Sequence, residues 1–187
     1  MKTDSSAARP AIQYVLRPAD PKGHLFEVML DASGLPDESL TVSLPAWIPG
    51  SYMIRDFARN IVEIRADDGR RRIALHKLDK HRWQARPRSG RLRLRYRVYA
   101  WDLSVRGAHF DESHAFFNGT SVFLRIDGYE SSACRVRLEP PPHTDDWRVA
   151  TTLPRAGARA WGFGDYQARD YDELIDHPVE MGVFEVA

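Results

Sequence analysis

Strict alternation of apolar and charged residues is the feature that most constrains how this chain folds. Between Arg91 and Tyr99, leucine, tyrosine or valine occupies every second position and arginine occupies the positions between them. Successive side chains of an extended strand point to opposite faces, so the run predicts a half-buried strand. We expect its charged side to form a solvated strand face or part of an interdomain surface, carried by Arg91, Arg93, Arg95 and Arg97.

Weaker segments of the same kind recur along the chain and are separated by turn-forming pairs such as Asp68-Gly69 and Asn118-Gly119. Many short strands at such spacing favour an all-β fold, either an antiparallel β-sandwich or a saddle-like double sheet. The further strands are expected at Ile12–Leu16, Leu25–Leu30, Leu40–Leu44, Ile61–Arg65, Trp83–Ala85, Val122–Ile126, Arg135–Leu138 and Trp161–Gln167.

Helix signals are few. One or two short helical turns are expected, the first around Tyr52–Arg59. The second would be capped by Asp170 or Asp172 and would end before Pro178, which disfavours helical geometry in the residue that precedes it. We interpret residues 1–10 as a flexible N-terminal tail and residues 11–187 as one β domain, because no linker, repeat or low-complexity segment divides them.

Composition excludes several classes of protein. The chain has 187 residues and a formal net charge of +1; its 27 basic residues comprise four lysines and 23 arginines, offset by 26 acidic residues. A nucleic-acid-binding domain is usually more basic or has one basic face, so we expect no nucleic-acid partner. The single cysteine, Cys134, excludes an internal disulfide framework and a multi-cysteine zinc site.

Targeting signals are also missing from the sequence. No stretch approaches the about 20 consecutive apolar residues of a membrane-spanning helix. The polar segment Met1–Pro10 lacks the apolar core of a secretory signal. We therefore expect no membrane partner and a cytoplasmic location.

The motifs of common hydrolases do not occur here. The sequence has neither H-E-x-x-H nor a G-x-S-x-G nucleophile elbow, and we expect Cys134 to be a buried thiol within a strand. One dense cluster combines His109, Asp111 and His114. Its histidines are five residues apart and would share no face of a helix or strand, so we predict a polar loop and no metal site. A self-contained hydrolase built on these three residues is the least favoured alternative.

Two segments combine residue types that generic packing does not require. The first, Leu44–Asn60, contains two prolines, a glycine, three aromatic residues and two arginines, and predicts a rigid, structured loop. The second, Tyr171–Gly182, places several carboxylates around a turn that Pro178 fixes.

At these residues the chain resembles the N-terminal domain of the glycyl aminopeptidase family of zinc metallopeptidases. The motifs follow one another in the family's order and cover most of the chain. They are Pro45-Ala46-Trp47-Ile48-Pro49-Gly50-Ser51-Tyr52 with Ile54-Arg55-Asp56-Phe57-Ala58, then Trp101-Asp102-Leu103-Ser104-Val105-Arg106, Phe116-Phe117-Asn118-Gly119-Thr120-Ser121, and Tyr171-Asp172-Glu173-Leu174-Ile175-Asp176 with Pro178-Val179-Glu180-Met181-Gly182.

The resemblance implies a zinc aminopeptidase that prefers small N-terminal residues such as glycine as the parent protein. Its zinc ligands and H-E-x-x-H motif would lie downstream of Ala187. The present domain would hold no cofactor and no catalytic residue, pack against the catalytic domain and help to close the cleft for a peptide substrate. We expect a truncated piece, because the chain stops within the β-type run Val183–Val186.

The resemblance also suggests residues that reach the cleft. In the wider superfamily the equivalent β domain supplies polar groups that hold the substrate's free α-amine. By position, the turn Asn118-Gly119-Thr120 is the first candidate, and Glu180 is the second; the alternatives are a hairpin turn and an interface salt bridge. Tyr52 and Arg55 would either line the cleft or brace their loop, and bracing is the favoured interpretation.

An alternative function is an independent peptide- or carbohydrate-binding β-sandwich. Its binding platform would be an exposed tryptophan, either Trp47, Trp83 or Trp101. Self-association of the isolated domain is also expected to be possible, because it would leave a partner surface uncovered.

Overall fold

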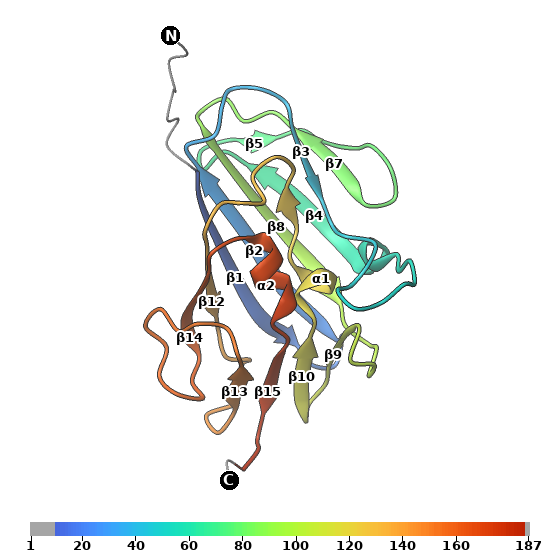
Figure 1. The fold of residues 1–187 in the computed structure, drawn as a ribbon, viewed down its shortest axis with the longest axis vertical. Helices are drawn as coiled ribbons and strands as arrows, with labels where there is room; N and C mark the ends of the chain where they lie inside the picture. The colour runs from blue at the N-terminus through green and yellow to red at the C-terminus, as the bar shows by residue number, and fades with distance from the viewer. Residues whose placement is uncertain (1–9, 186–187) are drawn as a thin grey trace.

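The computed structural model describes residues 10–185 and confirms an all-β fold with short helices (Figure 1). Of the expected tail, residues 1–9 lie outside the described residues, and Pro10 is buried. The elements are β1 (Ala11–Asp20), β2 (Leu25–Ser33), β3 (Leu40–Ser43), the 3₁₀ helix η1 (Phe57–Asn60), β4 (Ile61–Asp67), β5 (Arg72–Ile73), β6 (Leu75–Lys77), β7 (Arg82–Ala85), β8 (Arg91–Tyr99), β9 (Ala108–Phe110), β10 (His114–Phe117), α1 (Gly119–Val122), β11 (Arg125–Ile126), β12 (Cys134–Leu138), β13 (Arg148–Thr151), β14 (Gly164–Ala168), α2 (Tyr171–Asp176) and β15 (Val179–Gly182).

The strands form three sheets rather than the expected two. A seven-stranded sheet has the order β14-β12-β1-β2-β8-β4-β5, and two four-stranded sheets have the orders β13-β15-β10-β9 and β11-β3-β7-β6. The pairing is antiparallel except between β1 and β12, which run parallel. The large sheet is therefore mixed, because β12 returns beside β1 after a long connection instead of a hairpin.

The arginine face predicted for β8 lies on the outer side of the large sheet and is ion-paired. Burial opposes the charge of Asp31, but hydrogen bonds from two of the arginines lower the pKa of this carboxyl group. Partly exposed pairs of this kind add little stability individually, so the face mainly keeps the sheet solvated on one side. The pairs are Arg91 and Arg93 with Asp31, Arg95 with Asp67, and Arg97 with Glu27.

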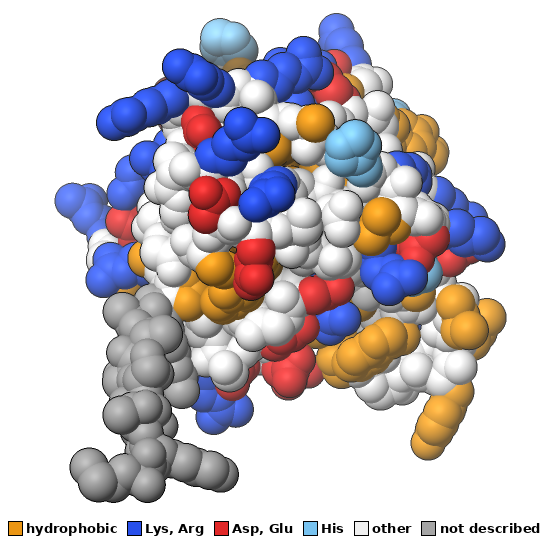
Figure 2. All heavy atoms as spheres, turned by 90° about the horizontal axis from the view of Figure 1, so that it is seen from above, with side chains coloured by type: hydrophobic (Ala, Val, Ile, Leu, Met, Phe, Trp, Pro, Cys, Tyr) orange, Lys and Arg blue, Asp and Glu red, His pale blue; other side chains and the backbone are white. Residues whose placement is uncertain are grey.

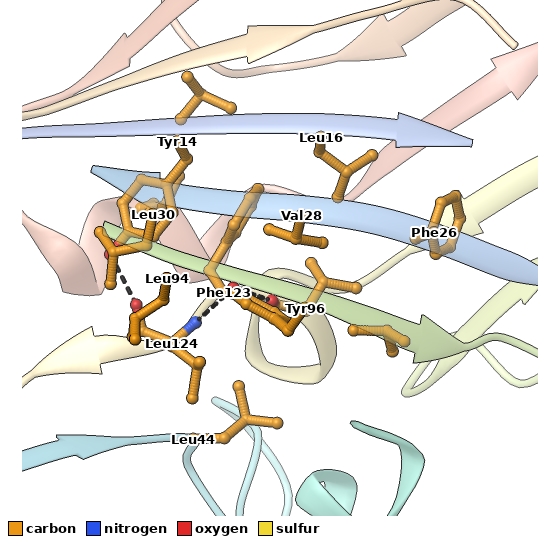
Figure 3. Close-up of a cluster of buried hydrophobic side chains, with 14 of the residues drawn as sticks. Tyr14, Leu16, Phe26, Val28, Leu30, Leu44, Leu94, Tyr96, Phe123 and Leu124 are labelled. Carbon is orange, nitrogen blue, oxygen red and sulfur yellow. Dashed lines mark hydrogen bonds between the residues drawn. The ribbon is translucent and has the colours of Figure 1, made fainter. Parts of the chain in front are cut away.

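The inner face of the large sheet carries the core. Side chains from β1, β2 and β8 alternate inward and meet the segment between α1 and β11 and the end of β3 (Figure 3). The largest side chains of this cluster have almost no exposed surface, which is where burial contributes most to stability. They include Tyr14, Leu16, Phe26, Val28, Leu30, Leu44, Leu94, Tyr96, Phe123 and Leu124.

Three buried tyrosines, from β1, β8 and α2, hold residues 122–124, at the end of α1 and directly after it. The expected strand Val122–Ile126 is wrong for this part, and only Arg125–Ile126 pairs as a strand. The carbonyl groups before it are satisfied by phenol hydroxyls instead of a neighbouring strand, as buried backbone requires. Tyr96 donates to the oxygen of Val122, Tyr171 to that of Phe123, and Tyr14 to that of Leu124, over 2.7, 2.6 and 2.8 Å.

Other boundaries also differ from the sequence prediction. The strand expected from Trp161 begins only at Gly164, because the backbone at both residues has a positive φ that breaks the extended run. Residues 183–185 are not in a strand, since β15 ends at Gly182. Of the turn expected around Tyr52–Arg59, only η1 is helical, whereas α2 begins after its predicted cap, Asp170.

No helix within residues 10–185 is long and apolar enough to cross a membrane.

Candidate functional site

The sheet β13-β15-β10-β9, called here the small sheet, positions the second substrate-binding candidate. Val179 and Met181 of β15 point into the core, so the alternation turns Glu180 to the outer face. Glu180 lies directly opposite Phe116 of β10, and Phe116 lies opposite His109 of β9. The outer face of the small sheet therefore places an acidic, an aromatic and an imidazole side chain in one row.

The first candidate, Asn118, comes directly after β10 and continues its extended backbone, with φ −92° and ψ 134°. Two residues after Phe116, its side chain leaves the strand on the same side, so Asn118 and Glu180 belong to one face. The interpretation of this turn as a hairpin is wrong, because Asn118 is the N-cap of α1. Its Oδ1 atom accepts hydrogen bonds from the Thr120 backbone amide and hydroxyl, at 3.4 and 3.0 Å.

Gly119 and Thr120 are buried beneath this surface. A Cβ atom on Gly119 would lie 2.8 Å from the Cα atom of Ile175 and 3.0 Å from the carbonyl oxygen of Leu174, both in α2. The glycine thus permits close contact between the two helices. All three residues of the turn are buried, Asn118 with 9% and Thr120 with none of its surface exposed.

Glu180 is half-buried, and burial raises the pKa of its carboxyl group, although the charge of His114 opposes this shift. None of the ion pairs among residues 10–185 includes Glu180. A partly desolvated carboxylate of this kind gains from a cation that approaches it.

The histidine cluster is closer together than its sequence spacing indicated. The β9–β10 hairpin stacks His109 on His114, with ring centroids 4.9 Å apart, and the expectation that they share no face is wrong. The ligand atoms of both histidines and Asp111 lie within 4.8 Å of one another. Burial opposes ionisation of Asp111, but hydrogen bonds from Ser113, His109 and the His114 amide hold its pKa well below the usual range. The absence of a metal here stays a prediction.

The three tryptophans proposed as a binding platform differ in exposure. Trp83 is buried, so it cannot serve as a platform. Trp47 and Trp101 are about half exposed, at 48% and 53%. Trp101 stacks between His24 and His109, with centroid distances of 3.8 and 4.8 Å, and so extends the row of rings on the outer face of the small sheet.

The loop before η1 carries the remaining candidates. The ring of Tyr52 is fully exposed, so it does not brace the loop, contrary to the favoured interpretation. Arg55 is half-buried, and its backbone amide donates to the carbonyl oxygen of Ala46 at 2.7 Å, which closes the base of the loop. Its Nε atom is buried without a hydrogen-bond partner.

Cys134 has the environment that the sequence predicts. It is 2% exposed in β12, and burial raises the pKa of its thiol to about 12, with a smaller contribution from Asp170. Such a thiol is neutral at physiological pH and is a poor nucleophile.

Comparison with known proteins shows which family and which solved structures this domain resembles. Residues 13–183 match the family described as the peptidase M61 N-terminal domain. A crystal structure of an aminopeptidase N family protein from Idiomarina loihiensis is 40% identical with a TM-score of 0.88, and the match covers 91% of this chain and 29% of that chain. No curated protein sequence matches significantly.

A second solved structure, an M1 zinc metallopeptidase from Deinococcus radiodurans bound to a Tyr-Ser-Ala substrate, has a TM-score of 0.54 at 15% identity. It is matched over 94% of this chain and 43% of its own, and at this identity it shows the fold alone. The present chain therefore spans less than half of either structure. The family match and the 40% identical relative agree with the motifs from Pro45 to Gly182, and the chain belongs to the peptidase M61 N-terminal domain family, as an N-terminal domain of the aminopeptidase type.

Proposed function

We propose that this chain is the non-catalytic N-terminal β domain of a zinc-dependent aminopeptidase that prefers small N-terminal residues such as glycine. The domain packs against the catalytic module and shapes the cleft that holds the substrate N-terminus. The sequence contains no H-E-x-x-H, so residues outside it would bind the zinc of the parent enzyme. The family match supports the proposal at the level of the domain.

The observation that carries the finer assignment is the shared position of Glu180 and Asn118. Glu180 points to the outer face of the small sheet opposite Phe116, Asn118 follows two residues after Phe116 as the cap of α1, and Glu180 is half-buried without an ion pair among the described residues. A substrate ammonium group needs a compensating acceptor once it leaves water. The Glu180 carboxylate would supply the charge, and the amide of Asn118 would orient the peptide beside it.

The test is steady-state kinetics of the full-length parent with a glycyl anilide substrate. Glu180→Ala and Asn118→Ala are each expected to lower kcat/KM about tenfold, the effect of losing a hydrogen bond to a charged group. Glu63→Ala removes an exposed carboxylate from β4, outside the small sheet, and is the matched control. Unchanged kinetics in both test variants would reject the anchoring role, and turnover by the 187-residue chain alone would reject a non-catalytic domain.

A second candidate function is an independent peptide- or carbohydrate-binding module, and the exposed ring of Trp101 favours it. Stacking on such a ring would change tryptophan emission. Titrating the isolated chain with oligosaccharides or short peptides while recording tryptophan fluorescence separates the two functions. Saturable quenching that Trp101→Ala abolishes supports an independent binding module. Unchanged fluorescence supports the aminopeptidase domain.

A further inference from the structure

Two loops each expose several large apolar side chains. The long loop, residues 46–56, exposes Tyr52 fully and Ile54 at 82%, and the short loop, residues 101–107, exposes Leu103 and Val105 at 74% and 73%. Isolated exposed hydrophobic residues need no explanation, but a group of them marks an interaction surface. Trp47, Met53 and Trp101 belong to the same two loops.

The two loops lie around the same short helix, α1. The long loop leads into η1, which packs against α1. In the short loop, the carbonyl oxygen of Gly107 accepts a hydrogen bond from the backbone amide of Asn118 at 3.0 Å and another from the Ser121 hydroxyl at 3.2 Å. Figure 1 shows both loops projecting on the same side of α1, and Figure 2 shows several exposed apolar groups at one edge of the molecule, with others elsewhere on the same face. We call the exposed side chains of both loops the apolar rim.

Backbone contacts hold both loops in place. The long loop is closed by the bond between Arg55 and Ala46, and Ile48 anchors it, since only 6% of this side chain is exposed. In the short loop, the amide of Gly107 donates to Ser104 at 3.1 Å. The rim is therefore presented on closed turns, which reduces the ordering entropy that a partner must overcome.

The rim contains two carboxylates, Asp56, which pairs with Lys80, and Asp102, which accepts a hydrogen bond from the Ser104 amide, but neither of them pairs with Arg55. Among residues 10–185, the buried Nε atom of Arg55 has no hydrogen-bond partner, and the guanidinium group donates to the sulfur atom of Met53 at 3.9 Å. No ion pair among residues 10–185 includes Arg55, Arg59 or Arg106. A partner that covers the rim should therefore be apolar and place a carboxylate against Arg55.

We propose that the apolar rim is the docking surface for the catalytic module of the same polypeptide, which presents an apolar face with a carboxylate opposite Arg55. This assignment rests on the proposed function. The length of the relative supports this occupant, since a match to 91% of this chain covers only 29% of a 40% identical protein. Docking at the rim would bring the catalytic module beside Asn118, whose backbone amide bonds to Gly107 of the short loop.

Methionine oxidation tests the proposal without any substitution. Met53 is 63% exposed in the long loop, whereas Met29 lies half-buried in β2, on the ion-paired side of the large sheet. Hydrogen peroxide oxidises accessible thioethers. We expect Met53 to react at least tenfold more slowly in the full-length protein than in the 187-residue chain, and Met29 to react at the same rate in both. Equal rates for Met53 would overturn the proposal.

Substitutions at the rim give an independent readout. Ile54→Asp and Leu103→Asp should leave the melting temperature of the 187-residue chain unchanged but lower that of the full-length protein by about 5 °C or more, because a charge would be buried at the interface. Trp161→Asp is the control: it alters an exposed aromatic residue in the loop between β13 and β14, and its backbone conformation tolerates aspartate. Because the Trp161 ring also contacts Phe184, each loss is taken as the difference between the full-length protein and the 187-residue chain; a larger difference for Trp161→Asp than for the rim variants would place the interface elsewhere.

The outcomes separate this surface from the proposed function. If the full-length protein cleaves a glycyl substrate but its Met53 is unprotected, the proposed function holds and the apolar rim is not the docking surface. If Met53 is protected but the protein has no aminopeptidase activity, the rim is the docking surface and the proposed function is wrong. If Met53 of the 187-residue chain is protected at high concentration and becomes reactive on dilution, a second copy covers the rim, and the proposed occupant is wrong.

Discussion

The ionised carboxyl group of Glu180 lowers the free energy of unfolding of the isolated domain. Burial disfavours its charged form, and the described residues supply only a neighbouring histidine as a compensating group. A folded-state pKa above the unfolded value means that the folded protein holds its proton more tightly, so this group lowers stability as the pH rises through its folded pKa. Residues kept in spite of such a cost are often functional.

Replacing Glu180 with glutamine should therefore stabilise the 187-residue chain at pH 7. We expect a higher midpoint of urea unfolding for Glu180→Gln than for the wild type at pH 7, and no difference near pH 4, where the carboxyl group is largely protonated in both states. Glu63→Gln, on an exposed part of β4, should show no such pH dependence. An equal or lower midpoint for Glu180→Gln at pH 7 would contradict the destabilising role of this charge.

At the level of elements, α1 depends entirely on its surroundings. A helix of four residues is far below the length at which helices are stable in water. Its position is determined by the Asn118 cap, by the tyrosine hydroxyls that bind residues 122–124, and by close contact of Gly119 with α2. The placement of Asn118, the candidate that would orient the peptide, thus depends on these three supports.

Gly119→Ala should separate the two helices. The added methyl group would meet the backbone of α2 at 2.8 Å, so we expect a loss of about 1–3 kcal/mol in the free energy of unfolding, as for other overpacked sites. In Gly162→Ala, the methyl group would have its nearest contacts at 3.4 Å, and stability should change little. Denaturant unfolding of both variants checks the prediction, and similar stabilities would show that α1 and α2 can move apart without cost.

For the whole molecule, the buried thiol of Cys134 reports global unfolding. It lies in β12 within the large sheet and belongs to the continuous core cluster. Burial and a pKa of about 12 should prevent reaction with a thiol reagent at pH 8 while the protein is folded. We expect labelling to follow the same denaturant midpoint as circular dichroism; rapid labelling without denaturant would show that the sheet opens locally beside β1.

Sequence patterns predicted the parts of the fold that are half-buried. β8, β2 and β1 each have one core face and one solvated face, so alternation is visible in their residues. The small sheet was not predicted, because its strands have three or four residues each and obtain their order from partners distant in sequence. This is why Glu180 was selected by its motif alone. The proximity of His109 to His114 was missed for a different reason, because the β9–β10 hairpin that stacks them was not predicted.

The loop candidates show a similar limit. Prolines and aromatic residues in Leu44–Asn60 correctly indicated a structured loop, since a backbone bond closes its base. The same pattern did not distinguish an aromatic residue that packs inward from one that faces solvent, and Tyr52 does the latter. Exposure depends on what lies beside the loop in three dimensions, and the apolar residues Leu103 and Val105 of the second loop carried no separate signal.

The three tyrosines that bind residues 122–124 also impose an order on the maturation of the protein. They come from the beginning, middle and end of the domain, at positions 14, 96 and 171. A growing polypeptide cannot fix α1 until its last tyrosine has left the ribosome, so the anchor at Asn118 would form only once nearly the whole domain has been synthesised. A nascent chain that ends between residues 168 and 171 would contain all seven strands of the large sheet but no finished site.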